Sequence, residues 1–150
     1  MGEVVALVDY GAGNLHSVHN ALKAAGADVT VTADPYVVRA ADRIVLPGVG
    51  SFKACAEGLN AISGMVEAMT ERVHIGGAPF LGICVGMQLL ADRGLEHGET
   101  PGLGWIPGEV RLIEPSDTSI KVPHMGWNDV AVLPHARDHA VIEEGEAYFL

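Results

Sequence analysis

The sequence predicts an α/β fold in which a mostly parallel sheet carries helices on both faces, with a small antiparallel extension. Short apolar runs alternate with helical patterns over the first half of the chain, an order typical of parallel strands joined by right-handed crossovers. The run at residues 4–8 (VVALV) is continuous rather than alternating, which indicates a strand buried on both faces. The 19 glycines fit many tight turns between strands and helices.

Length and composition favour one globular domain over residues 1–150, since a domain typically has about 100–200 residues. The chain has 19 acidic and 9 basic residues and a net charge of −10. This balance excludes general nucleic-acid binding, because phosphates are held by Lys and Arg. Two cysteines form no disulfide scaffold and suit a reducing compartment. The N-terminus has no targeting signal, so we expect a soluble cytoplasmic protein.

One segment imitates a membrane span. Residues 73–91 contain no Asp, Glu, Lys or Arg, and the run is close to the length that crosses a bilayer. The same run contains Pro79 and several glycines, so a buried strand, a sharp turn and a helix start explain it better. We expect no membrane association.

The first two strand–helix units are marked by capping residues. Residues 4–8 (VVALV) are predicted to form a strand, after which Asn14 caps a helix with an apolar face from Leu15 to Ala25. Residues 29–32 form the second strand. Asp34-Pro35 then reads as an N-cap followed by proline at the first helical position.

The next two units contain the strand ends of most interest. Residues 44–46 are the third predicted strand, and helical material follows over residues 51–73 with a break near Ser63-Gly64. Residues 79–83 are the fourth strand, and residues 85–91 begin another helix.

The second half changes character. Short β-like stretches with Gly- and Pro-rich turns replace the helical pattern, and we interpret them as a partly antiparallel extension of the same domain. Residues 147–150 (AYFL) have the pattern of a buried strand that is just beginning. Because terminal residues are usually polar and frayed, we expect the domain to be incomplete at its C-terminus.

The most informative motif is Gly82-Ile83-Cys84-Val85-Gly86. An apolar strand leads into it and a helix leads out, which is the nucleophile-elbow pattern with cysteine as the nucleophile. Glycines two residues to either side relieve the crowding of such a turn. The amino end of the helix favours a thiolate at Cys84, and the N–H of Val85 can donate to an oxyanion. Cys55, between alanines in a helical stretch, is expected to be buried filler.

A second group of small residues, Pro47-Gly48-Val49-Gly50, follows the third strand. The loop lies at the carboxyl edge of the sheet, where α/β proteins place their ligands. Its backbone N–H groups are suited to supply a second oxyanion donor, and an ordinary strand-to-helix turn is the structural alternative. The sequence shows no metal-ligand cluster and no phosphate-binding P-loop.

Four motifs together resemble the class I (triad-type) glutamine amidotransferases. The segment 82–90 (GICVGMQLL) resembles their nucleophile motif. The loop 47–50 (PGVG) resembles the oxyanion loop of one branch, the glutaminase subunits of imidazole glycerol phosphate synthases. Segments 9–15 (DYGAGNL) and 123–128 (PHMGWN) match the same branch. The resemblance implies the flavodoxin-like fold of this family.

The resemblance implies glutamine hydrolysis by covalent catalysis. Cys84 would attack the side-chain amide of L-glutamine, form a glutamyl thioester and release ammonia, and water would then free glutamate. The N–H groups of the loop 47–50 and of Val85 would hold the oxyanion, and Gln88 would contact the bound glutamine. No cofactor is implied.

The resemblance also implies a partner, a (β/α)₈-barrel cyclase subunit. Ammonia would react there with a phosphoribulosyl formimino nucleotide, giving imidazole glycerol phosphate and an aminoimidazole carboxamide nucleotide in histidine biosynthesis. Trp127 suits a hot spot of the interface. The residues expected near this partner are Pro123, His124, Met125, Gly126, Trp127 and Asn128.

The general base is the point of departure from the family, which uses a His-x-Glu pair near the carboxyl end of its domain. The sequence contains one such string, His97-Gly98-Glu99. A helix of about eight residues after Cys84 would carry the chain on the order of 12 Å from the site, so we expect His97 near the opposite edge of the sheet. The other histidines have no strong claim, and we expect the catalytic pair to be absent.

Three functions stay open at this point. The first is the glutamine-dependent ammonia supplier, and the second is another cysteine-elbow protein, such as the glutaminase of pyridoxal phosphate synthase or a chaperone-like hydrolase relative. The third is a truncated, catalytically dead chain that only binds the cyclase. The segment 123–128 argues against the second, and partner binding without ammonia release would favour the third.

If the chain ends at Leu150, we expect little or no glutamine turnover even with the cyclase present, because the His-Glu pair would be missing. A glutaminase assay checks this on a chain whose intact mass is verified as 15.7 kDa. Normal turnover by that chain would contradict the expectation.

Overall fold

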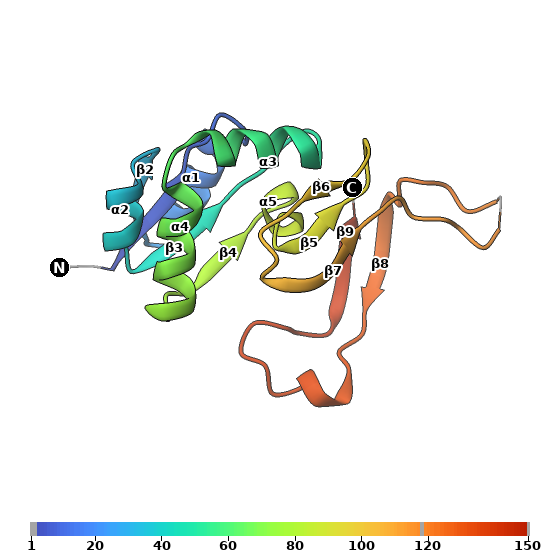
Figure 1. Cartoon of the computed structure of the whole chain (residues 1–150). Helices are drawn as coiled ribbons and strands as arrows, with labels where there is room; N and C mark the ends of the chain where they lie inside the picture. The colour runs from blue at the N-terminus through green and yellow to red at the C-terminus, as the bar shows by residue number, and fades with distance from the viewer. Residues whose placement is uncertain (1–2, 118, 150) are drawn as a thin grey trace. The chain divides into compact units, whose positions relative to one another are not determined.

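A four-stranded parallel sheet is the framework of residues 1–112 (Figure 1). The computed structural model describes residues 3–117 and 119–149. The strands lie in the order β2-β1-β3-β4 and pair in parallel. All four expected strands are confirmed, and no bound differs from the expected one by more than one residue: β1 (Val4–Val8), β2 (Asp28–Thr32), β3 (Arg43–Leu46) and β4 (Phe80–Gly82).

Helices cover both faces of this sheet, as expected. Side chains of α1 pack on Val5, Leu7 and Val45 on one face, whereas the other helices bury a larger cluster on the opposite face. None of the helices within residues 3–117 and 119–149 is long and apolar enough to cross a membrane. The helices are α1 (Leu15–Ala24), α2 (Pro35–Ala40), α3 (Phe52–Ala61), α4 (Met65–Thr70), a π-helical turn (Glu71–Ile75) and α5 (Val85–Gln88).

Local capping accounts for where α1, α2 and α4 begin. The Asn14 side chain accepts a hydrogen bond from the N–H of Ser17, and the Asp34 side chain accepts one from Tyr36. Both expected N-caps are therefore confirmed. Gly64 adopts φ = +80° between α3 and α4, a conformation that glycine adopts without a Cβ penalty, and it produces the expected break.

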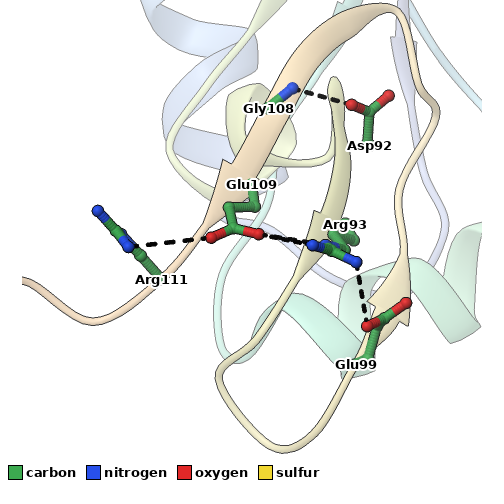
Figure 2. Close-up of polar contacts among 6 residues, drawn as sticks. All are labelled: Asp92, Arg93, Glu99, Gly108, Glu109 and Arg111. Carbon is green, nitrogen blue, oxygen red and sulfur yellow. Dashed lines mark hydrogen bonds and ion pairs between the residues drawn. The ribbon is translucent and has the colours of Figure 1, made fainter.

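Residues 91–110 form a second, mixed sheet rather than more of the first one. Strand β5 (Ala91–Gly94) pairs antiparallel with β6 (Thr100–Pro101) and parallel with β7 (Ile106–Val110). Figure 2 shows Arg93 of β5 between two carboxylates, with Nη2 2.9 Å from Glu109 and Nη1 3.2 Å from Glu99. The pKa of Arg93 is raised above its usual value, and the largest cause is the hydrogen bond that its guanidinium donates to Glu109. These ion pairs are exposed and stabilise the sheet only weakly.

The expected helix over residues 85–91 is wrong in its second half. Helix α5 ends at Gln88, and Ala91 already belongs to strand β5. The reason is non-local. The carbonyls of Leu89 and Leu90 accept hydrogen bonds from Leu103 and Trp105 at 2.7 and 2.9 Å, and Ala91 pairs with Ile106 of β7, so these residues join the second sheet instead of a further helical turn.

Residues 113–150 form a separate compact unit. Its main feature is an antiparallel pair, β8 (Gly126–Val130) with β9 (Gly145–Phe149), in which Trp127 faces Tyr148. The expected strand at the chain end is confirmed through residue 149, and Leu150 lies outside the described residues. Its expected burial is wrong, because Tyr148 and Phe149 are 51% and 41% exposed.

The burial of β3 predicts a large difference between two isoleucines. Ile44 is 1% exposed under the larger cluster, whereas Ile75 is 84% exposed. We expect Ile44→Ala to lower the free energy of unfolding by about 2–5 kcal/mol, because it leaves a cavity in the core. Ile75→Ala should change it by less than about 0.5 kcal/mol. Urea denaturation of both variants measures this, and equal effects would contradict the described core.

Candidate active site

Cys84 lies in a strained turn between β4 and α5. Its backbone has φ = +55° and ψ = −118°, and among the described residues no other non-glycine has a positive φ. Such a conformation costs about 1–3 kcal/mol and persists only where the surroundings enforce it. The residue is exposed. The turn therefore holds an accessible thiol in a conformation that this residue type rarely adopts, as in a nucleophile elbow.

The flanking glycines are required by close backbone contacts. A Cβ at Gly82 would lie 2.6 Å from Cα of Met87. A Cβ at Gly86 would lie 2.0 Å from the carbonyl oxygen of Leu46. Neither contact can be relieved by moving a flexible side chain. The sequence-based argument that side chains at these two positions would collide with neighbouring backbone is confirmed.

The loop 47–50 lies directly against this turn. A Cβ at Gly48 would be 2.4 Å from the amide nitrogen of Gly86 and 2.9 Å from Cβ of Val85. Within residues 3–117 and 119–149, the N–H groups of Gly48, Val49 and Gly50 donate no hydrogen bond. The structure thus brings the predicted oxyanion loop beside Val85 and leaves its donors available for a ligand.

The loop after β1 also contacts the loop 47–50. A Cβ at Gly13 would lie 3.0 Å from the ring of Pro47, and the Tyr10 hydroxyl donates to the Pro47 carbonyl at 2.5 Å. A cavity of about 580 Å³ opens between this loop, Val49 and α3. Cys84 is not among its lining residues, so the surface at the thiol is distinct from this cavity.

Gln88 lies one helical turn beyond Cys84. Its backbone N–H donates to the Cys84 carbonyl at 3.1 Å, and the residue is half-buried. Within the described part of the chain its side-chain amide forms no hydrogen bond. The amide is therefore free to bind a ligand near the thiol.

The segment after β5 does not lie where the sequence predicted, and it contains Glu96, which the sequence analysis did not identify. The Glu96 carboxylate accepts a hydrogen bond from the N–H of Phe52 at 2.9 Å, beside the loop at the carboxyl end of β3. The expectation that His97 lands near the opposite edge is therefore wrong. Helix α5 has only four residues and therefore advances about 6 Å. Strand β5 then leads the chain to the N-terminus of α3, where Glu96 lies. Glu96 caps a helix that lies far away in sequence, so no local pattern could have revealed it.

The histidines of the described residues do not engage the thiol. His97 is exposed and lies 3.8 Å from the Glu96 carboxylate, and His74 stacks edge-on against Trp105. No histidine in residues 3–117 or 119–149 hydrogen-bonds Cys84. In the same residues, no group of three or more His, Cys, Asp or Glu could hold a metal ion.

The segment 123–128 lies in the second unit, where it leads into β8. Met125 and Trp127 are 63% and 70% exposed. The Trp127 ring meets Tyr148 of β9 edge-on with centroids 5.6 Å apart. Large apolar side chains held open in this way mark an interaction surface more often than a core.

Comparison with known proteins agrees with these features. The family described as "Glutamine amidotransferase class-I" matches residues 6–141. The imidazole glycerol phosphate synthase subunit HisH of Zymomonas mobilis is 56% identical over 97% of this chain and 69% of its own length. HisH of Caulobacter vibrioides is 51% identical over 98% of this chain and 72% of its own length.

Solved structures show the same fold at low sequence identity. A crystal structure of a glutamine amidotransferase aligns with a TM-score of 0.68 and 18% identity, covering 97% of this chain and 70% of that one. A protein described as a peptidase E from Listeria monocytogenes aligns with a TM-score of 0.58 and 15% identity over 71% and 64% of the two chains. With this fold, a cysteine elbow beside a glycine loop, and relatives more than 50% identical, the chain belongs to the class I glutamine amidotransferases, in the branch of the HisH subunits.

Proposed function

We propose that this chain carries the glutamine-hydrolysing site of an imidazole glycerol phosphate synthase. The observation that carries the proposal is the contact between the Cys84 turn and the loop 47–50. The turn presents an accessible thiol at φ = +55°, and the loop places beside Val85 N–H groups that donate to no other described residue. A nucleophile next to oxyanion donors is the arrangement that acyl transfer requires.

The chemistry proceeds by nucleophilic attack. The Cys84 sulfur adds to the side-chain carbonyl carbon of glutamine, and the carbonyl oxygen becomes an oxyanion bound by the N–H groups of Val85 and of the loop 47–50. The C–N bond then breaks, and the nitrogen leaves as ammonia with the proton that the Cys84 thiol gave up to a general base. Water hydrolyses the thioester and releases glutamate. The Gln88 amide contacts the bound glutamine.

The ammonia is consumed by a partner, a (β/α)₈-barrel cyclase subunit. The relatives that support this are named as subunits of imidazole glycerol phosphate synthase. The cyclase joins the ammonia to a phosphoribulosyl formimino nucleotide, which yields imidazole glycerol phosphate and an aminoimidazole carboxamide nucleotide. The exposed segment 123–128 docks on this partner, and the reaction takes place in the cytoplasm.

Removal of the thiol tests the proposed reaction. In the protein at the length of its relatives, with the cyclase present, Cys84→Ala should lower glutamine turnover by at least about 10³-fold, because no thioester can form. An electrophilic glutamine analogue should modify the unaltered protein at Cys84, as located by mass spectrometry. Cys55 is the internal control, since it is fully buried and should stay unmodified. Turnover retained by Cys84→Ala would refute the proposed function.

Truncation of the exposed tryptophan tests the partner surface. Trp127→Ala should raise the Kd for the cyclase about 30-fold, because a central aromatic anchor contributes about 2 kcal/mol. Isothermal titration calorimetry measures the change. Tyr36→Ala is the matched control, since Tyr36 is an equally open aromatic at 79% exposed on α2. A Kd that responds to Tyr36→Ala but not to Trp127→Ala would place the interface elsewhere.

A further inference from the structure

Two buried side chains donate hydrogen bonds to backbone carbonyls of the loop 47–50. The Tyr10 hydroxyl donates to the Pro47 carbonyl at 2.5 Å, and the Cys55 thiol donates to the Val49 carbonyl at 3.4 Å. Tyr10 is 6% exposed and Cys55 is fully buried. Tyr10 lies in the loop after β1, and Cys55 lies in the first turn of α3. Their hydrogen bonds therefore connect the loop 47–50 both to the loop after β1 and to α3.

The two bonds fix specific peptide planes. A peptide unit is planar and trans, so fixing its C=O also fixes the direction of its N–H. The bond to Pro47 sets the N–H of Gly48, and the bond to Val49 sets the N–H of Gly50. The peptide between them, which carries the N–H of Val49, is then held at both ends. These are the donors that have no acceptor among residues 3–117 and 119–149.

A glycine loop needs such restraint. Gly48 and Gly50 have wide conformational freedom, and Gly50 adopts φ = +98° with open space around its Cα. Oxyanion stabilisation depends on donors that are oriented before the charge develops. No described side chain other than Tyr10 and Cys55 donates to a carbonyl of the loop 47–50.

The surroundings keep Tyr10 in the donor state. Burial, and then the adjoining Cys55 side chain, raise the pKa of the Tyr10 phenol well above its usual value, so the hydroxyl keeps its proton. The backbone and ring of Tyr10 also lie against Gly58 of α3, where a Cβ would be 3.0 Å from the Tyr10 carbonyl oxygen. The ring is consequently held in place under the loop.

We propose that Tyr10 and Cys55 are positioning residues of the glutaminase site. Their hydrogen bonds orient the peptide planes of the loop 47–50 so that its N–H groups bind the oxyanion formed on glutamine. The inference rests on the proposed function, because it assigns the loop to that reaction. Both side chains are buried and act through the loop, so we expect them to contribute to the transition state and not to glutamine binding.

Steady-state kinetics of the full-length protein with its cyclase partner test this inference. Tyr10→Phe removes one hydroxyl and should lower kcat about tenfold with KM for glutamine unchanged within about twofold. Cys55→Ala should lower kcat in the same way, and Cys55→Ser, which keeps a donor, should restore about half or more of it. Tyr36→Phe is the control, because Tyr36 is 79% exposed, and should match the unaltered protein.

A second readout separates positioning from loss of fold. Alkylation of Cys84 by iodoacetamide forms no oxyanion, so its rate should stay unchanged in Tyr10→Phe and Cys55→Ala while glutamine turnover falls. Should Tyr10→Phe unfold at the assay temperature, the pair Cys55→Ala and Cys55→Ser decides alone. The inference is overturned by unchanged kcat, by KM and alkylation that change in parallel with kcat, or by Cys55→Ser that is no better than Cys55→Ala.

The Cys84→Ala variant distinguishes this outcome from failure of the proposed function. If that variant still hydrolyses glutamine, the reaction does not use this site, and both proposals fall. If it is inactive while Tyr10→Phe and Cys55→Ala keep full kcat, the glutaminase assignment stands and only the positioning role is refuted.

Discussion

The contact between two backbone turns, one at Gly48 and one at Gly86, is the constraint on which the site depends. A Cβ at Gly86 would lie 2.0 Å from the Leu46 oxygen, and one at Gly48 would lie 2.4 Å from the Gly86 nitrogen. Side chains at these positions would force apart the two loops that follow β3 and β4. The Cys84 thiol and the N–H groups of the loop 47–50 would then no longer be neighbours, whatever their own conformations.

The sheet brings these turns together. Strands β3 and β4 are adjacent and parallel, with Leu46 in register with Gly82, so the loops that follow them leave from one edge. Strand β1 is the other neighbour of β3, which places Tyr10 at the same edge. Because β1 and β3 are buried on both faces, a one-residue shift in register would exchange the side chains that the two core layers receive and disturb the packing of both.

The strain at Cys84 is held by the packing of the residues that follow it. Val85 and Leu89 are 5% and 1% exposed and belong to the larger core cluster. The N–H of Ile83 donates to the Leu46 carbonyl at 2.9 Å, so the residue before the thiol is tied to β3 as well. The turn therefore cannot relax without disturbing the core, which explains how an exposed residue keeps a positive φ.

Features with a local cause could be predicted from the sequence. The apolar runs of β1 and β3, the caps at Asn14 and Asp34, and the glycines of the Cys84 turn each depend on residues close in the chain. The prediction failed where a distant segment competes for the same groups. The end of α5 is the clearest case, because the residues that follow it form hydrogen bonds with Leu103 and Trp105 and pair with β7.

The sequence alone therefore determined the fold class, the glycine-flanked turn at Cys84 and the glycine loop, since each is encoded in a short pattern with a direct steric or apolar reason. Only the tertiary structure decided what surrounds them. Tyr10 meets Pro47 across 37 residues and Glu96 meets Phe52 across 44. Hydrogen bonds over such separations leave no periodic or compositional trace, because their geometry exists only once the sheet has brought the segments together.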